Sequence, residues 1–117
     1  MSDRKQVLIV DDSMVSRMMV FAIIKDAHPD WDISQAADAD EAINMENLAD
    51  CDYVTLDMNM PGKTGLEIAP ALISAAPHAK IALLTANIQD YVKMESQRLG
   101  IELIAKPITE EKILNFI

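Results

Sequence analysis

The sequence predicts a doubly wound α/β fold, in which a parallel five-stranded sheet carries helices on both faces. Short apolar runs alternate five times with longer amphipathic stretches, and strict alternation of this kind requires parallel strands joined by helical crossovers. The chain has 117 residues, of which 50% are hydrophobic and 25% charged, an ordinary globular balance. We therefore expect a single domain over residues 1–117.

The five strands are expected at the short apolar runs. These runs cover residues 6–10, 31–36, 52–56, 80–85 and 101–104. The first reads VLIV after its opening glutamine and is apolar on both faces, which is typical of a buried parallel strand. The second is the most polar of the five and therefore the weakest prediction.

The five helices are expected at the amphipathic stretches that follow each strand. They cover residues 13–27, 38–48, 65–76, 88–99 and 109–117. Thr64 and Glu67 form a capping-box pattern at the third helix, and Gly100 is placed to end the fourth. Pro70 falls inside the third helix and cannot donate a backbone hydrogen bond, so this helix is expected to begin late or to kink.

Composition excludes several classes of function. There are 10 basic and 19 acidic residues, a formal net charge of −9, which argues against binding to nucleic acid or to an anionic membrane. The longest apolar run, residues 18–24, is too short to span a bilayer, and no signal-peptide pattern opens the chain. Cys51 is the only cysteine, so no internal disulfide can form. We expect a cytoplasmic protein.

Polar residues stand where the predicted strands end. Asp11 and Asp12 follow the first strand, Asp57 the third, and Lys106 the fifth, while Thr85 ends the fourth. Ligands of doubly wound sheets bind at this edge. Three neighbouring carboxylates repel one another unless a cation binds between them, and oxygen ligands favour Mg²⁺. Asp57 can act as a nucleophile toward phosphorus, with Lys106 and Thr85 binding the acquired phosphoryl oxygens.

These motifs together resemble the receiver domain of bacterial response regulators, and the resemblance covers the whole chain. The motifs are Asp11-Asp12, Asp57-Met58-Asn59-Met60-Pro61-Gly62, Thr85-Ala86 and Lys106-Pro107. The resemblance implies a flavodoxin-like sheet of strand order 2-1-3-4-5. It also implies that Asp57 accepts a phosphoryl group from a phosphohistidine on a sensor histidine kinase or a histidine phosphotransfer protein, as a switch in two-component signalling.

The resemblance further implies the roles of individual site residues. Mg²⁺ is expected on Asp12, Asp57 and the main-chain oxygen of Asn59, with Asp11 bound through water. Thr85 and Lys106 are expected to bind the phosphoryl group, and the peptide bond between Lys106 and Pro107 is expected to be cis. A receiver of this kind is not an enzyme in the usual sense, because it catalyses only its own phosphorylation and dephosphorylation.

Leu103 departs from the receiver pattern. Receivers usually carry Tyr or Phe three residues before the lysine, as a switch that follows the movement of the threonine. A leucine can fill the same space as Thr85 moves but has no hydroxyl to bond. The sequence fits two kinds of protein. One is a single-domain regulator of the chemotaxis type, and the other is a receiver trimmed from a longer regulator with an output domain.

Three other functions compete with the phosphorylated switch. A phosphatase of the haloacid dehalogenase kind also uses a nucleophilic aspartate, but it carries a second acid two residues later, where this chain has Asn59. A flavodoxin-type carrier needs a phosphate-binding loop after the first strand, and this loop is acidic. A docking module that is never phosphorylated is the third alternative.

The first helix carries a second apolar stripe. On a helical wheel one group is expected to face the sheet: Ser16, Met19, Val20 and Ile23. Met14, Met18 and Phe21 gather on the opposite side, where polar residues would be usual. Either Phe21 packs on the last helix and the methionines cover it, or this stripe docks the helices of the phosphohistidine donor.

Overall fold

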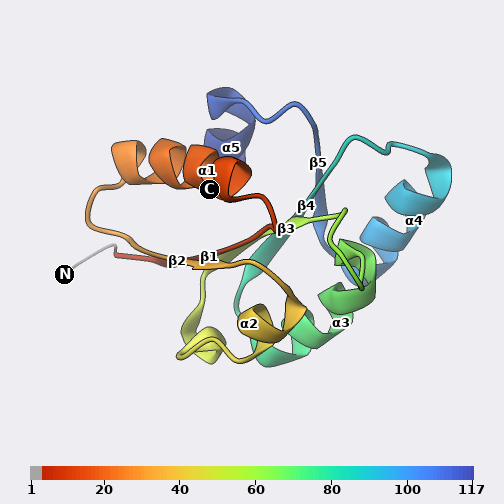
Figure 1. Cartoon of the computed structure of the whole chain (residues 1–117), viewed down its shortest axis with the longest axis horizontal. Helices are drawn as coiled ribbons and strands as arrows, with labels where there is room; N and C mark the ends of the chain where they lie inside the picture. Colours follow the sequence, from red (N-terminus) through yellow and green to blue (C-terminus); the bar gives the residue numbers. More distant parts are fainter. Residues whose placement is uncertain (1–3) are drawn as a thin grey trace.

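The computed structural model describes residues 4–117, whose strands form one parallel sheet in the order β2-β1-β3-β4-β5 (Figure 1). The strands are β1 (Gln6–Val10), β2 (Asp32–Ala36), β3 (Tyr53–Asp57), β4 (Lys80–Thr85) and β5 (Glu102–Ala105). The predicted flavodoxin-like α/β fold is confirmed, and each strand lies within one residue of its predicted bounds.

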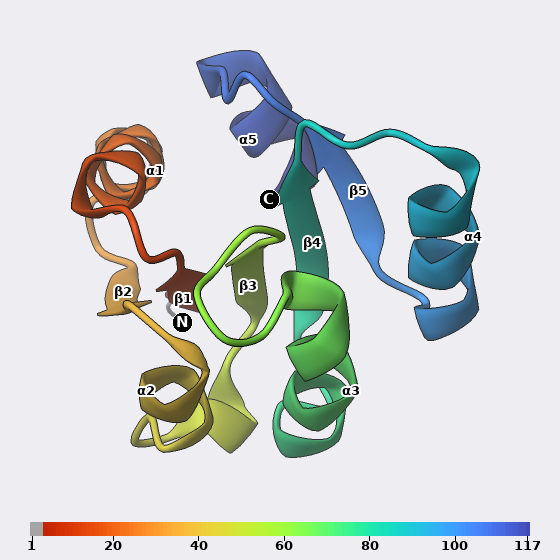
Figure 2. The same ribbon diagram turned by 45° about the vertical axis from the view of Figure 1, so that its right-hand side comes forward.

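The helices form two layers, with α1 and α5 on one face of the sheet and α2, α3 and α4 on the other (Figure 2). They are α1 (Met14–Ala27), α2 (Ala39–Ile43), α3 (Gly65–Ala75), α4 (Asp90–Leu99) and α5 (Glu110–Phe116), with a short 3-10 helix η1 (Leu48–Asp50). Each layer has its own buried apolar cluster against the sheet. Within residues 4–117, no helix has both the length and the apolar character that crossing a membrane requires.

The predicted helix over residues 38–48 is wrong in its second half. α2 ends at Ile43, and Asn47 adopts a left-handed backbone with φ of 62° before η1 begins. The Asn44 side chain donates to the carbonyl oxygen of Asp40 at 2.9 Å. Such a bond competes with the helical ladder, which is why asparagine is common where helices end.

The predicted late start of α3 is also wrong. The helix begins at Gly65 with both bonds of the capping box between Thr64 and Glu67, and it continues through Pro70 to Ala75. Proline has no N–H, so the carbonyl of Leu66 has no donor four residues on. Pro70 itself is exposed to solvent.

The register of the strands brings the predicted site residues to one edge of the sheet. The partners nearest that edge are Val10 with Leu56, Asp57 with Leu84, and Thr85 with Ala105. The residues that end or follow β1, β3, β4 and β5 therefore share the carboxyl edge. This edge is where doubly wound sheets bind their ligands.

Candidate functional site

The acidic centre is formed by Asp11, Asp12 and Asp57. Each offers a carboxylate oxygen, and these oxygens all lie within 4.8 Å of one another. Asp11 and Asp57 are 3% and 2% exposed, whereas Asp12 is open to solvent. Three carboxylates this close, with no His or Cys among them, fit a hard divalent cation such as Mg²⁺, which takes oxygen ligands and keeps several waters.

Asp11 is the carboxylate most affected by its surroundings. Burial raises its pKa, and the neighbouring carboxylates of Asp57 and Asp12 raise it too, while the backbone N–H of Ser13 and the ammonium of Lys106 oppose the rise. The Ser13 N–H donates to Asp11 Oδ1 at 2.9 Å. The ionised carboxylate of Asp11 is therefore less stable than it would be in water, and a bound cation would remove this destabilisation.

Lys106 provides the positive charge of the site. Its Nζ donates to Asp57 Oδ1 at 2.7 Å, and its peptide bond to Pro107 is cis, as the resemblance implied. Its backbone N–H donates to the carbonyl of Thr85 at 2.9 Å, which ties the end of β5 to the end of β4. The Lys106 side chain is 30% exposed, so this charge lies at the border between the site and solvent.

Thr85 is fully buried, and its hydroxyl is engaged with the loop before α4. Thr85 Oγ1 accepts a hydrogen bond from the backbone N–H of Asn87 at 2.9 Å, and Asn87 Nδ2 donates to the hydroxyl of Tyr91 at 3.1 Å. The same loop delays α4, which begins at Asp90 and not at the predicted residue 88. The Thr85 O–H itself donates to the carbonyl of Asn87 at 3.5 Å, and this is the bond it would give up to donate to a phosphoryl oxygen, whereas the bond it accepts from the Asn87 N–H could remain.

The loop after β3 packs against β3 through Gly65, which was predicted only as the start of a helix. The Gly65 N–H donates to the carbonyl of Met58 at 2.8 Å. A Cβ on Gly65 would lie 2.6 Å from the carbonyl oxygen of Asp57 and 2.6 Å from Leu83 Cδ1. Only glycine allows this approach. Asn59, on the same loop, is exposed.

Leu103 lies on β5 and lines a shallow groove. It pairs with Leu83, so it stands two residues before the carboxyl edge at which Thr85 pairs with Ala105. It is half-buried and packs against the cluster under α3 and α4. The groove, about 370 Å³ in volume, is lined by Lys93, Ser96, Gln97, Ile101 and Leu103. The position therefore faces α4, which also carries Tyr91.

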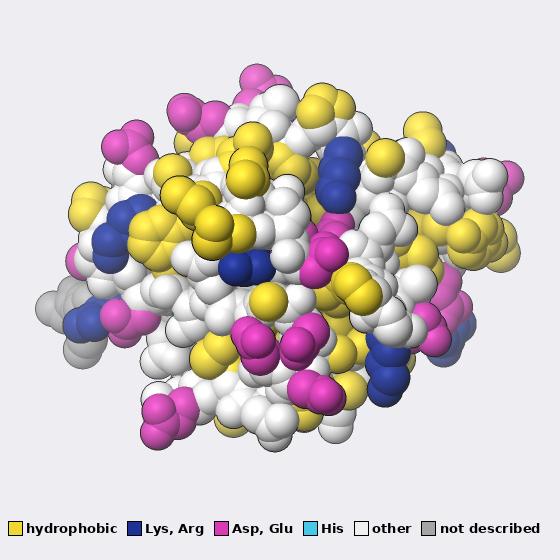
Figure 3. Space-filling view, viewed as in Figure 1, with side chains coloured by type: hydrophobic (Ala, Val, Ile, Leu, Met, Phe, Trp, Pro, Cys, Tyr) yellow, Lys and Arg dark blue, Asp and Glu magenta, His cyan; other side chains and the backbone are white. Residues whose placement is uncertain are grey.

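The apolar face of α1 differs from the predicted stripe. Met14 and Met18 are 62% and 57% exposed, as expected for an outward face. Val20 is buried as predicted, but Met19, which was also predicted to face the sheet, is 48% exposed, and Ile24 is buried in its place. Phe21 is half-buried against the cluster that includes α5. Hydrophobic side chains gather over α1 in Figure 3, and we define the α1 patch as Met14, Val15, Met18 and Met19.

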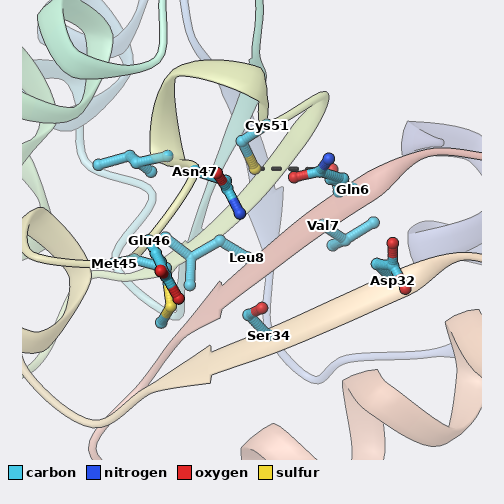
Figure 4. A pocket seen from close by; sticks show the side chains of 10 residues that line it. Gln6, Val7, Leu8, Asp32, Ser34, Met45, Glu46, Asn47 and Cys51 are labelled. Carbon is cyan, nitrogen blue, oxygen red and sulfur yellow. Dashed lines mark hydrogen bonds between the residues drawn. The ribbon is translucent and has the colours of Figure 1, made fainter.

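Cys51 lies in a different region, next to a small cavity under the edge strand β2 (Figure 4). The cavity is about 30 Å³, room for about one water molecule. The thiol of Cys51 donates to the carbonyls of Gln6 and Tyr53, and burial raises the pKa of this thiol to about 11. Since the thiolate is the reactive form and this thiol stays protonated, Cys51 acts as a packing residue.

Comparison with known proteins assigns the family. Residues 7–117 match the response regulator receiver domain. The chain belongs to this family. The receiver is 32% identical to the chemotaxis protein CheY of Listeria monocytogenes, over 93% of this chain and 92% of that protein.

Solved structures agree with this assignment. The receiver superposes on CheY4 of Vibrio cholerae with a TM-score of 0.84 at 32% identity, covering 96% of this chain and 94% of the other. It superposes equally well on one chain of a complex of CheX, CheY, BeF3 and Mg from Borrelia burgdorferi. The TM-score is 0.84 at 26% identity, and the superposition covers 96% of this chain and 85% of the other chain. The receiver is thus a signalling module whose acidic triad is consistent with the Mg²⁺ site of its family.

Proposed function

We propose that this receiver accepts a phosphoryl group on Asp57 from a phosphohistidine of a sensor histidine kinase or a histidine phosphotransfer protein, and that the modified form changes its binding to an output partner in the cytoplasm. The observation that carries the proposal is the environment of Asp57: a buried carboxylate with two acidic neighbours on one side and the Lys106 ammonium 2.7 Å away. Such a site favours a doubly charged cation and a phosphoryl group together.

The transfer exchanges one bond to phosphorus for another. A carboxylate oxygen of Asp57 attacks the phosphorus, an O–P bond forms, and the N–P bond of the phosphohistidine breaks with its electron pair going to the imidazole nitrogen. The imidazole leaves neutral because its second ring nitrogen keeps a proton. Attack by water on the aspartyl phosphate later releases inorganic phosphate and restores the carboxylate.

Several groups around Asp57 neutralise the negative charge of the phosphoryl oxygens. Asp11, Asp12, Asp57 and the main-chain oxygen of Asn59 would hold Mg²⁺, which supplies positive charge beside the phosphoryl oxygens when bound. Lys106 moves from the Asp57 carboxylate to a phosphoryl oxygen. The Thr85 O–H turns from the carbonyl of Asn87 to another phosphoryl oxygen, so the loop before α4 responds to phosphorylation even though Leu103 has no hydroxyl.

Acetyl phosphate, a small phosphoryl donor, tests this function without the natural partner. With Mg²⁺ present, we expect the protein to gain one phosphoryl group, measured by intact mass, and to lose it on treatment with hydroxylamine, which cleaves acyl phosphates. Chelation of Mg²⁺ should prevent the gain. A protein that stays unmodified under these conditions, or a modification that resists hydroxylamine, contradicts the proposal.

The α1 patch is proposed as the docking surface of the phosphohistidine donor. α1 begins directly after the acidic pair, with Ser13 as its cap, so a donor helix that covers the patch would be held beside Asp57. Four exposed apolar side chains on the water-facing part of a helix favour burial by a partner. Methionine side chains adapt readily to such contacts.

Replacing Met14 and Met18 with aspartate separates docking from chemistry. We expect phosphotransfer from a phosphorylated histidine phosphotransfer domain that reacts with the wild type to fall on the order of tenfold or more, the equivalent of about 1.4 kcal/mol. Phosphorylation by acetyl phosphate should stay near the wild-type rate. Met94→Asp is the matched control, because Met94 is 67% exposed on α4. If both reactions fall together the patch is structural, and if neither falls the donor docks elsewhere.

A further inference from the structure

Arg17 on α1 bonds to two neutral oxygens, one of which is the main-chain carbonyl of a residue in the acidic centre. Its Nη1 donates to the main-chain carbonyl of Asp11 at 2.7 Å, and its Nε donates to Gln35 Oε1 on β2 at 3.1 Å. Across residues 4–117 the ion pairs of the structure involve Arg4, Lys80, Arg98 and Lys106 but not Arg17. The half-buried guanidinium therefore bridges a loop and a strand instead of neutralising an acid.

We propose that Arg17 is a positioning residue for the metal site, which fixes the peptide between Asp11 and Asp12 so that both carboxylates point toward the cation. The carbonyl that Arg17 binds belongs to the one peptide group that joins these two residues. Without this anchor the backbone at Asp11 and Asp12 could shift, and a shift there would move both carboxylates. The proposal rests on the proposed function only in that it concerns the same metal site.

The N–H and the carboxylate of Asp11 are bonded to other parts of the chain, and its carbonyl is bonded to Arg17. The Asp11 N–H donates to the carbonyl of Ala36 at 3.0 Å, and the Asp11 carboxylate accepts from Ser13. Arg17 supplies the third attachment, from the helix that follows the loop. With all three in place, Asp11 is held by β2, by its own loop and by α1.

Arginine suits this role better than lysine. Its planar fork can donate to two oxygens at fixed angles, one on the loop and one on Gln35, whereas an ammonium is a single point charge. Because Gln35 is neutral, Arg17 is not drawn into an ion pair. Arg17 therefore takes up none of the carboxylate oxygens of the acidic centre.

The sign of the change in Mg²⁺ affinity distinguishes positioning from simple charge. A guanidinium near a cation site repels the cation, so removing it should tighten Mg²⁺ binding if charge alone matters. If Arg17 holds the ligands in place, removing it should weaken binding, since partners that orient metal ligands contribute about 10–100-fold to affinity. The two roles predict opposite results.

Calorimetric titration with Mg²⁺ alone measures this directly. We expect Arg17→Ala to raise the dissociation constant about tenfold or more, Gln35→Ala to raise it less, and Arg17→Lys to fall between wild type and Arg17→Ala. Arg98→Ala is the matched control, because Arg98 pairs with Glu95 on α4, and it should leave the constant unchanged. Thermal melting in chelator shows whether each variant is folded; if Arg17→Ala is not, Arg17→Lys and Gln35→Ala carry the test.

Phosphorylation by acetyl phosphate gives a second readout. In folded variants of Arg17, the Mg²⁺ concentration for half-maximal rate should rise by the same factor as the dissociation constant, and the rate at saturating Mg²⁺ should return to near the wild-type value. An unchanged or tighter Mg²⁺ constant, or a rate loss that saturating Mg²⁺ does not restore, overturns the proposal. If the wild type itself is not phosphorylated, the proposed function fails, while calorimetry still decides the role of Arg17.

Discussion

Asp57→Asn is expected to abolish phosphorylation by acetyl phosphate while leaving the protein folded. The amide has nearly the shape of the carboxylate but is a poor nucleophile, so the new O–P bond cannot form. The substitution removes one of three crowded carboxylates, which relieves repulsion, and leaves Lys106 close to the surface without its partner. These two effects on stability oppose each other.

The control for this variant is Asp26→Asn, which makes the same change on the exposed side of α1. Phosphoryl content is measured by intact mass under conditions that label the wild type fully. We expect background labelling for Asp57→Asn and full labelling for Asp26→Asn. Retention of the label in folded Asp57→Asn places the acceptor elsewhere.

Gly65→Ala is expected to destabilise the protein more than any other substitution of glycine by alanine. The added methyl group would meet the carbonyl oxygen of Asp57 and the side chain of Leu83, each at 2.6 Å, and Met58 Cα at 3.1 Å. A β-strand backbone cannot yield by this much, so α3 must move away from β3. Overpacking costs about 1–3 kcal/mol, and contacts of 2.6 Å that include a backbone oxygen put Gly65→Ala at the upper end, above the gain of up to about 1 kcal/mol from replacing a helical glycine.

Gly62 and Gly100 provide the matched controls. Both have positive φ, 85° and 75°, but a Cβ at either would meet nothing within 4 Å. Alanine there pays only the backbone strain of about 1 kcal/mol. Urea unfolding should rank Gly65→Ala as the least stable, with weakened Mg²⁺ binding because the loop that carries Asn59 moves with α3. A loss for Gly65→Ala no larger than for the controls contradicts the packing argument.

The sheet could be predicted from the sequence because its signals are strong and local. Runs such as VLIV are apolar on both faces, which is typical of a strand buried between two helical layers. The site followed from the sheet, since parallel strands bring their carboxyl ends to one edge. Asp11, Asp57, Thr85 and Lys106 were found by asking what stands at those ends.

The errors arose where side chains compete with the backbone or where tertiary packing decides. Asn44 ends α2 early, and the bonds of Asn87 with Thr85 and Tyr91 hold the loop before α4 out of the helix. α1 is apolar on most of its surface, so the helical wheel could not assign Met19 to the correct face. An asparagine two residues after a strand-end threonine is a turn signal that could have indicated the later start of α4.

Gly65 and Arg17 were missed for a different reason. A glycine at a helix start and an arginine in a helix are both ordinary in sequence. Their importance comes from a close approach to Asp57 and from a bond to the Asp11 carbonyl, and each of these contacts spans separate elements of the fold. Only the arrangement of β1, β3, α1 and α3 in space reveals them.

The most direct test of the account locates the phosphoryl group on the chain. The protein is phosphorylated with acetyl phosphate and Mg²⁺, reduced with borohydride, which converts an aspartyl phosphate into homoserine, and sequenced by mass spectrometry. We predict homoserine at position 57 and at no other aspartate. Homoserine at position 11 or 12, or a modification that leaves Asp57 unchanged, contradicts the assignment of Asp57 as the phosphoacceptor.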